Sequence, residues 1–253
     1  MMCGFPLAHL DKHLRILVQK HRRSVALCEE FHKYCDPKSS GFLKPQFERR
    51  VVRILTPGTL IDESFLNPYA NNFLLAISFS ENMIGLAWMD VSTGEFFSEK
   101  SSLASLPDHL ARIGPQEVVV DDEESISPTI KAMLVEANVS ISTVTRPSGA
   151  LSSVVTEVPQ PNDGVFSKEE SSAVSLLTSH LDRHLMEHAP KSFQLSREIG
   201  SSRMHIDAHT LKSLEIVHNI AEGGSKGSLM STFRRTVTSS GTRLLQRWLC
   251  MLL

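Results

Sequence analysis

The order of apolar and polar runs between residues 71 and 144 constrains the fold more than any other feature of the chain. Three short apolar runs joined by polar turns predict an antiparallel meander, and patterns typical of helix and strand then alternate twice. The expected elements are strands over 73–77, 84–89 and 95–97, a helix over 102–113, a strand over 117–121, a helix over 128–138 and a strand over 139–144. This order is typical of a ribonuclease-H-like α/β domain with a mixed sheet.

The N-terminal flank has the pattern of a helix and two strands. Apolar side chains recur at helical spacing over residues 7–20, and residues 24–28 then predict a buried strand. Prolines, serines and a glycine mark residues 31–47 as a surface loop. A second strand is expected over 50–55, and it ends in the turn Pro57-Gly58.

The C-terminal flank is expected to be helical. Residues 158–165 contain two prolines and a glycine and predict a linker. Ser167 and Glu170 then predict a capping box at the start of a helix, in which each side chain satisfies the backbone amide of the other. Further helical patterns cover 204–219 and 241–251. The expected fold class is α/β plus all-α, with units at 1–65, 66–160 and 161–253.

The charge balance excludes one class of function, which is nucleic-acid binding through an overall positive charge. The 26 lysines and arginines are offset by 28 acidic residues, which gives a net charge of -2. Any DNA contact therefore has to come from a local basic strip, for which the candidates are Lys44, Arg49, Arg50 and Arg53. Such charges pair with phosphates without reading sequence, but they also protect an ordinary edge strand from unwanted pairing, and both interpretations stay open.

Cysteine usage and hydropathy bear on the compartment. The four cysteines form no CxxC pair, which favours a reducing environment. No uninterrupted apolar run reaches transmembrane length, and the N-terminus does not resemble a signal peptide. We therefore expect a soluble protein with no membrane partner.

Four blocks of sequence occur in a fixed order. They cover residues 3–29, 49–63, 84–96, and 206–216 continuing to 236–249. In this order they resemble the MutS family of DNA mismatch-repair proteins. The resemblance implies that residues 1–65 are the C-terminal part of the mismatch-recognition domain, that 66–160 form the connector domain, and that 161–253 begin the helical core and lever domain.

The resemblance also implies partners. A MutS protein is a homodimer or heterodimer that binds mismatched double-stranded DNA as an ATP-dependent clamp, and its connector docks a MutL-type protein. The unbroken run TPGTLIDE from Thr56 to Glu63 is similar to the bacterial and mitochondrial branches of the family. It therefore implies a mitochondrial protein, with a nuclear one as the alternative.

Two hallmarks of the family are not found in the chain. The mismatch wedge of the family is a Phe-x-Glu hairpin, and neither Phe47-Glu48 nor Glu30-Phe31 matches its spacing or position. No G-x-x-x-x-G-K-[ST] P-loop occurs, and the glycine-rich run at 222–228 lacks the required spacing and a preceding strand, so it is interpreted as an interhelical loop. We expect no enzymatic activity and no cofactor in this chain, with ATP and Mg belonging to the ATPase domain of the family. The apolar end at 248–253 favours a fragment.

Two groups of metal-ligating side chains fall short of a site. They are His180, His184 and His188, and Cys28, His32 and Cys35. Imidazoles one helical turn apart can share a zinc ion, but no further ligand of clear spacing accompanies either group. The histidine stripe is offset from the leucine face of its helix, so a solvated surface is the alternative, and Cys28 is interpreted as a buried thiol.

Two other functions compete with mismatch repair. Carboxylates near strand ends would hold the two metals of a nuclease if they converged, and they are Asp90, Glu95, Asp121 and Asp122. The chain would otherwise be a stand-alone protein interaction module. Arg243 and Arg247 lie four residues apart among apolar side chains, and we expect them to form interdomain ion pairs rather than DNA contacts.

Overall fold

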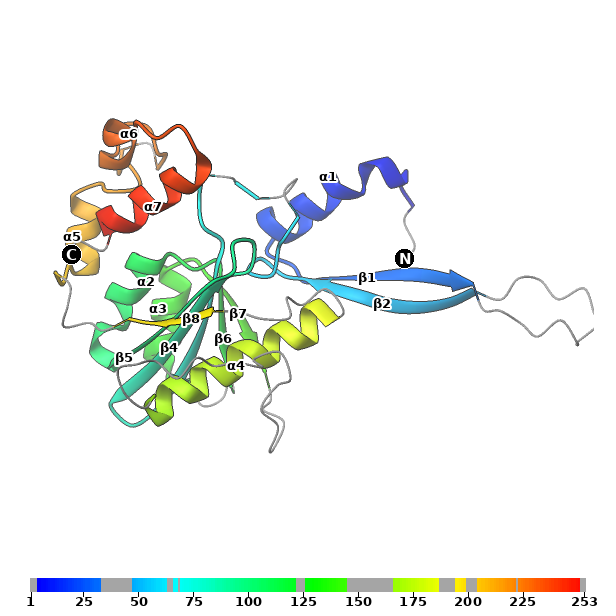
Figure 1. Ribbon diagram of the computed structural model, residues 1–253, viewed down its shortest axis with the longest axis horizontal. Coiled ribbons are helices and arrows are strands. Elements are labelled where there is room, and N and C mark those ends of the chain that lie inside the picture. The colour runs from blue at the N-terminus through cyan, green and yellow to red at the C-terminus, as the bar shows by residue number, and fades with distance from the viewer. Residues whose placement is uncertain are drawn as a thin grey trace, which may run out of the picture.

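A computed structural model describes residues 4–32, 47–62, 66–67, 69–121, 126–144, 166–186, 194–198, 204–221 and 223–250. Its N-terminal part, residues 4–62, is named the ribbon unit. Continuous helical structure runs through η1 (Leu7–His9), α1 (Leu10–Arg15) and η2 (Ile16–Lys20), and β1 (Val25–His32) then pairs antiparallel with β2 (Phe47–Leu55). Figure 1 shows the two strands extending away from the rest of the molecule with α1 beside them.

The core of the ribbon unit lies at its base, where Leu14 and Val18 pack against Leu55 and Leu60. The expected strand at 24–28 is present, but the prediction that it is buried is wrong. Cys28 is exposed, because a two-stranded ribbon has no second layer over its outer part. The thiol is therefore not the buried one that the sequence suggested.

The middle of the chain forms a six-stranded sheet, and the prediction that the sheet is mixed is confirmed. Its order is β7–β6–β3–β4–β5–β8. The central pairs β3–β4 and β4–β5 are antiparallel, whereas β6, β7 and β8 each join a parallel neighbour. The strands are β3 (Phe73–Phe79), β4 (Met83–Asp90), β5 (Glu95–Ser102), β6 (Glu117–Val120), β7 (Ser140–Thr143) and β8 (Gln194–Arg197).

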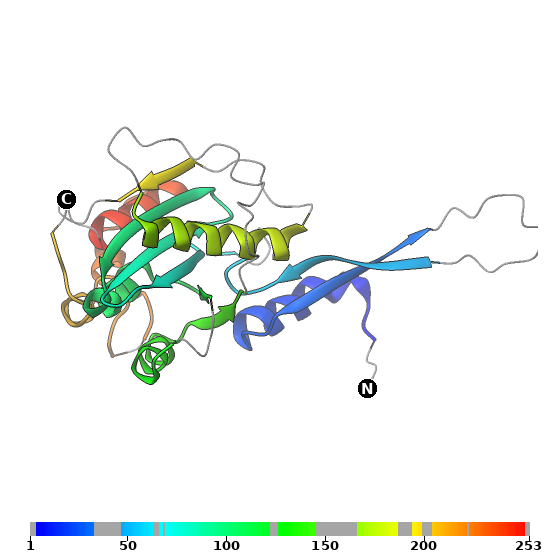
Figure 2. The same cartoon turned by 90° about the horizontal axis from the view of Figure 1, so that it is seen from below.

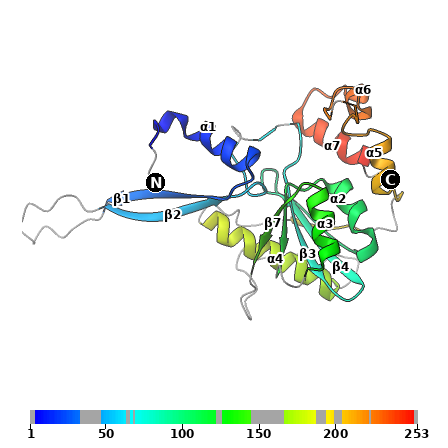
Figure 3. The ribbon, with the colours of Figure 1, turned by 180° about the vertical axis from the view of Figure 1, so that it is seen from behind.

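Helices cover both faces of this sheet. The sheet and these helices together are named the sheet unit. One face carries α2 (Leu106–Ile113), which follows η3 (Leu103–Ser105), and α3 (Pro128–Glu136), whereas α4 (Lys168–Leu185) crosses the other (Figures 2 and 3). Side chains alternate between the two layers along β3, so that Leu75 packs toward α2 and Leu74 toward α4. Both faces are buried, which explains why β3, β4 and β6 are mainly apolar.

The capping box predicted at the start of α4 is present. Ser167 Oγ accepts from Glu170 N at 3.2 Å, and Glu170 Oε2 accepts from Ser167 N at 2.9 Å. The helix was expected to open a separate helical unit, but it packs on the sheet, and β8 from the same stretch adds an edge strand. The leucines of α4 supply the apolar layer that this face of the sheet needs.

The described residues of the C-terminal part contain three helices, which are named the helical group. They are α5 (Ala208–Ser213), α6 (Leu229–Phe233) and α7 (Ser239–Cys250). The helix expected over 204–219 spans only α5, because Asp207 caps its start and Glu215 adopts a left-handed backbone (φ 49°) just beyond its end. The predicted linker at 158–165 lies outside the described residues. None of the helices that are described is long and apolar enough to cross a membrane.

Candidate functional site

The basic strip of β2 is paired with acidic side chains. Arg49 forms an ion pair with Glu30 across the ribbon at 2.7 Å, and Arg50 pairs with Glu48 along its own strand at 2.9 Å. Arg53 pairs with Asp62 at 2.5 Å beside the turn that follows β2. Lys44 lies outside the described residues.

These pairs reduce the positive field that a DNA phosphate would meet. The hydrogen bond and the charge of Glu30 raise the pKa of Arg49 above its ordinary value. A phosphate on this strand would have to compete with a carboxylate for each guanidinium. DNA contact by these arginines stays a prediction, and the structure adds that the ribbon carries its own counter-charges.

The ribbon unit joins the sheet unit through a buried polar contact. Gly58, in the turn after β2, donates its backbone N–H to Glu117 Oε2 at 2.8 Å, and Ser142 Oγ lies 2.6 Å from the other carboxylate oxygen. The amide of Asn72 donates to the carbonyl of Pro57 at 3.0 Å. A Cβ atom at Gly58 would lie 2.9 Å from Cβ of Glu117, so only glycine allows this approach. We call this contact the ribbon junction.

A histidine of α4 completes the ribbon junction. His180 is fully buried, and its Nε2 atom lies 3.3 Å from Glu117 Oε1, at ion-pair distance but out of hydrogen-bond alignment. Burial alone raises the pKa of Glu117, but His180 and the hydroxyls of Ser142 and Thr56 outweigh it and lower that pKa to about 2. The carboxylate is therefore held ionised inside the protein.

The solvated-surface interpretation of the histidine stripe is wrong for His180, which packs inward. Its ring stacks on that of His184 with centroids 3.9 Å apart. Burial, and then the charge of His180, lower the pKa of His184. His188 is outside the described residues, and the described part of the chain contains no group of three or more side chains arranged to hold a metal ion.

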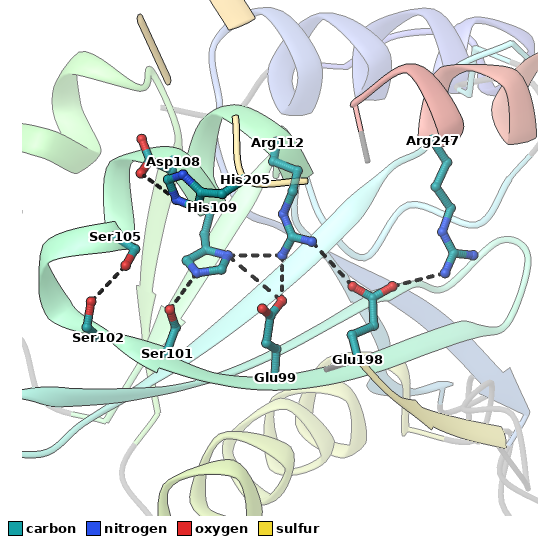
Figure 4. Close-up of polar contacts among 10 residues, drawn as sticks. All are labelled: Glu99, Ser101, Ser102, Ser105, Asp108, His109, Arg112, Glu198, His205 and Arg247. Carbon is teal, nitrogen blue, oxygen red and sulfur yellow. Dashed lines mark hydrogen bonds and ion pairs between the residues drawn. The ribbon is translucent and has the colours of Figure 1, made fainter. Parts of the chain in front are cut away.

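A second polar network joins the sheet unit to the helical group, and Figure 4 shows its side chains. Arg112 on α2 lies between two buried carboxylates, 2.7 Å from Glu99 Oε2 and 3.4 Å from Glu198 Oε2. Arg247 on α7 reaches the other oxygen of Glu198 at 3.0 Å. Its guanidinium also lies 4.2 Å from the ring centroid of Phe97. We call this network the helical junction.

One turn earlier on α2, Asp108 makes a second link to the helical group. Its Oδ1 atom accepts from the backbone N–H of Ala208 at 2.7 Å, and Oδ2 lies 3.3 Å from His205 Nε2 (Figure 4). Asp108 and Arg112 therefore project from one face of α2 toward the same neighbours. The expected ion pair between units is confirmed for Arg247 and stays a prediction for Arg243.

The described carboxylates of the nuclease alternative, Asp90, Glu95 and Asp121, do not meet at one place. Asp90 and Glu95 are cross-strand partners, but Asp121 follows β6, whose direction carries it toward the other end of the strands. Asp90 is fully buried and accepts from the backbone N–H groups of Asn72 and Ser92 at 3.0 and 2.9 Å. That carboxylate is occupied in closing the meander, and Asp122 lies outside the described residues.

The glycine-rich run and the cysteine group are the remaining sequence candidates. The glycine-rich run lies between α5 and α6, as expected for an interhelical loop, and Asn219 Nδ2 donates to the carbonyl of Lys226 at 3.3 Å. Glu222 is outside the described residues, as is Cys35. Cys28 lies on the exposed ribbon.

Sequence reasoning missed most residues of the two junctions. Glu117 starts an otherwise apolar strand, and Asp108 and Arg112 lie on a helix whose apolar face is clear. The available signal was Glu117 itself, a charged residue at the start of a buried strand, since such a group needs a partner. The partner itself is distant in sequence and was not predictable.

Comparison with known proteins places these units in one family. Three family models match the chain in order: MutS domain I over residues 1–64, MutS domain II over 72–153 and MutS domain III over 209–251. The DNA mismatch repair protein MutS of Nitrobacter hamburgensis is 35% identical over 257 residues, which cover 96% of this chain and 28% of the relative. The MutS of Rhodopseudomonas palustris (strain BisB18) is 35% identical over 259 residues, with the same coverage of each chain. That of Cereibacter sphaeroides is 34% identical over 253 residues, covering 97% of this chain and 28% of the relative.

The chain spans about 28% of the length of these curated relatives. The matched regions correspond to the ribbon unit, most of the sheet unit and most of the helical group. These ordered matches show that the chain belongs to the MutS family.

Proposed function

We propose that this chain is part of a MutS-type DNA mismatch-repair protein, in which it links mismatch recognition to the core. The observation that carries the proposal is the ordered match to MutS domains I, II and III. In this proposal the ribbon unit is the end of the recognition domain, the sheet unit is a ribonuclease-H-like connector, and the helical group begins the lever system. The mixed sheet with helices on both faces supports the connector assignment.

The proposed mechanism is mechanical. The ribbon junction lies on β6, and the helical junction lies on β5, α2 and the residue that follows β8. A displacement of the ribbon unit on DNA would act on Gly58 and Glu117, and its effect would leave the sheet unit through Arg112 and Glu198. In this proposal the chain does no chemistry itself, and ATP and Mg act in the ATPase domain of the family.

The partners follow from the same proposal. The whole protein would be a homodimer or heterodimer that clamps mismatched double-stranded DNA, and the sheet unit would dock a MutL-type protein. The similarity of TPGTLIDE to the bacterial and mitochondrial branches supports a mitochondrial location over a nuclear one. Subcellular fractionation with an antibody to this chain would test the location.

The function is tested by replacing the matching segment of the Nitrobacter hamburgensis MutS with this chain. The chimaera is expressed in a bacterium that lacks MutS, and the spontaneous mutation rate is measured. We expect the rate to fall toward that given by the intact bacterial protein. A version carrying Glu117→Gln and Arg112→Gln is the control, because it keeps the segment but weakens both junctions. A folded, dimeric chimaera that leaves the mutation rate as high as no MutS would contradict the proposal.

The isolated chain provides a second test. We expect it to bind a duplex with a G·T mismatch no more tightly than the matched duplex, and to hydrolyse no ATP, since the wedge and P-loop signatures were not found in it. Fluorescence anisotropy and a phosphate-release assay measure these two quantities. A preference for the mismatched duplex would contradict the assignment of recognition to another part of the protein.

A further inference from the structure

Positive charge is concentrated in one helical segment of the ribbon unit. Residues 12–23 contain five lysines and arginines and no acidic residue, whereas acidic residues slightly outnumber basic ones in the whole chain, by 28 to 26. The segment covers most of α1, all of η2 and the turn that leads into β1. A net charge near zero therefore coexists with a basic region that lies outside β2.

The helical segment turns this charge away from the core of the ribbon unit. Leu14 and Val18 are buried at the base of the ribbon, while four cations of the same segment are exposed. Figure 1 shows α1 lying beside the two strands, at the outside of the molecule. We call the four exposed cations the helix strip, and they are Lys12, Arg15, Lys20 and Arg23.

The charges of the helix strip are not compensated by carboxylates of the described residues. Arg15 donates from Nε to Oε1 of Gln19 at 3.3 Å, and this partner is neutral. The other three members form no ion pair with a described acidic side chain, including Asp11, the acidic residue nearest in sequence. Each described arginine of β2, by contrast, has a carboxylate partner. The uncompensated positive charge of the ribbon unit therefore lies on its helix.

Helix stability accounts for only part of the helix strip. The helix dipole favours cations in the last turn, where Lys20 lies, because that end carries a partial negative charge. It does not favour a cation in the first turn of α1, where Lys12 lies. Lys12 therefore needs another explanation.

The length of the helix strip suits a nucleic-acid backbone. At about 1.5 Å per residue, Lys12 and Lys20 lie roughly 12 Å apart along the helix axis. The phosphates of one DNA strand are spaced about 3.4 Å apart along the duplex axis, so the strip spans about three or four of them. Long basic side chains can pair with such phosphates without reading the bases.

We propose that the helix strip binds the phosphate backbone of double-stranded DNA independently of sequence. The inference rests on the proposed function, because it gives the ribbon unit of a mismatch-repair protein a surface that holds the duplex whether or not a mismatch is present. The strip, rather than β2, is then the local basic region that a chain of net negative charge needs for DNA contact.

The test is fluorescence anisotropy of the 253-residue chain with a fully matched duplex, at potassium chloride concentrations from about 50 to 200 mM. The helix pair, Lys12→Gln with Lys20→Gln, should bind about tenfold or more weakly than the parent at the middle of this range. Its plot of log affinity against log salt should be shallower by about 1.8, since two phosphate contacts are removed. Glutamine and lysine have similar helix propensities, so circular dichroism should show the same helix content in both proteins.

The matched control is Lys212→Gln with Lys226→Gln, which removes two exposed lysines from the helical group and changes the net charge equally. Its affinity and salt slope should stay close to those of the parent. Equal losses in the helix pair and in this control would overturn the proposal, because they would show a diffuse charge effect.

A second comparison tests the strand. Arg49→Gln with Arg50→Gln removes two cations that already have carboxylate partners, so it should weaken DNA binding less than the helix pair does. A larger loss in this strand pair would overturn the proposal, and so would a parent chain that shows no salt-dependent binding to the duplex.

The mutation rate given by the chimaera separates this inference from the proposed function. If the chimaera restores repair and the helix pair binds the duplex as tightly as the parent chain, the inference alone fails. If the chimaera does not restore repair but the helix pair loses DNA affinity as expected, the proposed function alone fails.

Discussion

At the scale of single residues, Glu117 is the side chain at the centre of the ribbon junction. It is fully buried, it is held ionised, and it receives hydrogen bonds from the turn of the ribbon unit and from β7 while His180 lies beside it. A buried carboxylate is stable only with such partners. Its contribution to folding should therefore depend on pH.

The pKa of Glu117 is about 2 in the folded protein and near 4.5 when the chain is unfolded. Because the folded value is the lower one, the stabilisation is present above pH 4.5 and is lost as the pH falls toward 2. The shift corresponds to on the order of 3 kcal/mol of unfolding free energy. Urea unfolding at pH 7, 5, 4 and 3 should show this loss in the parent chain.

The variant Glu117→Gln should be less stable than the parent at pH 7, because His180 loses its charged partner. Its unfolding free energy should fall less steeply between pH 4.5 and pH 3. Glu29→Gln, at an exposed position of β1, should keep the steep acid dependence of the parent. A slope in Glu117→Gln equal to that of the parent would mean that other groups carry the acid sensitivity.

At the scale of elements, the packing of α4 on β4 depends on Gly85. A Cβ atom there would lie 2.0 Å from the carbonyl oxygen of Glu169, in the first turn of α4, and that atom is backbone and cannot turn aside. We expect Gly85→Ala to lower the unfolding free energy by about 3 kcal/mol or more. Hydrogen exchange should show α4 amides losing protection before those of β3.

The matched control is Gly224→Ala, since a Cβ atom at Gly224 meets nothing within 4 Å. It should change the unfolding free energy by no more than about 0.5 kcal/mol. If Gly85→Ala proves as mild as this control, α4 does not lie as close to β4 as the structure places it.

The sequence predicted those elements whose pattern is local. The meander, the helices on either side of β6 and the capping box of α4 follow from periodicity and from short turns. It missed β8, because four residues with a polar alternation give no clear signal, and their pairing with β5 is set by tertiary contacts. It also assigned α4 to the wrong neighbours, since an amphipathic pattern shows that a helix has a buried face without showing what covers it.

The same limit applies to the two junctions. His180 lies off the leucine stripe of α4, so the pattern predicted a solvated position. A fully buried carboxylate on β6, which is far away in sequence, is the reason that it faces inward. The sequence correctly indicated an ion pair for Arg247, because arginine among apolar residues on a helix needs a partner, but it did not indicate Glu198.

At the scale of the whole molecule, Arg247 should control how firmly α7 is held. Removing it leaves one oxygen of the buried Glu198 without its partner on α7, whereas Arg112 still reaches the other. We expect Arg247→Gln to accelerate hydrogen exchange of α7 amides about tenfold, which corresponds to about 1.4 kcal/mol. The exchange rates of β3 and β4 should not change.

The control is Arg235→Gln, an exposed arginine in the segment between α6 and α7. It should leave the exchange of α7 unchanged. In the double variant Arg247→Gln with Glu198→Gln, part of the effect should be recovered, because the buried carboxylate that lost its cation on α7 is then replaced by a neutral amide. Fully additive effects of the two substitutions would show that the pair is not coupled.

The position of the two junctions has a mechanical consequence for the sheet. They lie on β6 and on β5 with its neighbours, with β3 and β4 between them. A pull applied between them acts across the strands, along the backbone hydrogen bonds, so it would open the sheet one strand at a time, as a zipper opens. The helix α4 packs on β3, β4 and β5 together, so it bridges strands that lie between the two junctions (Figure 2). Under such a pull, the leucine face of α4 would share the load among these strands before any single pair of strands had to bear it.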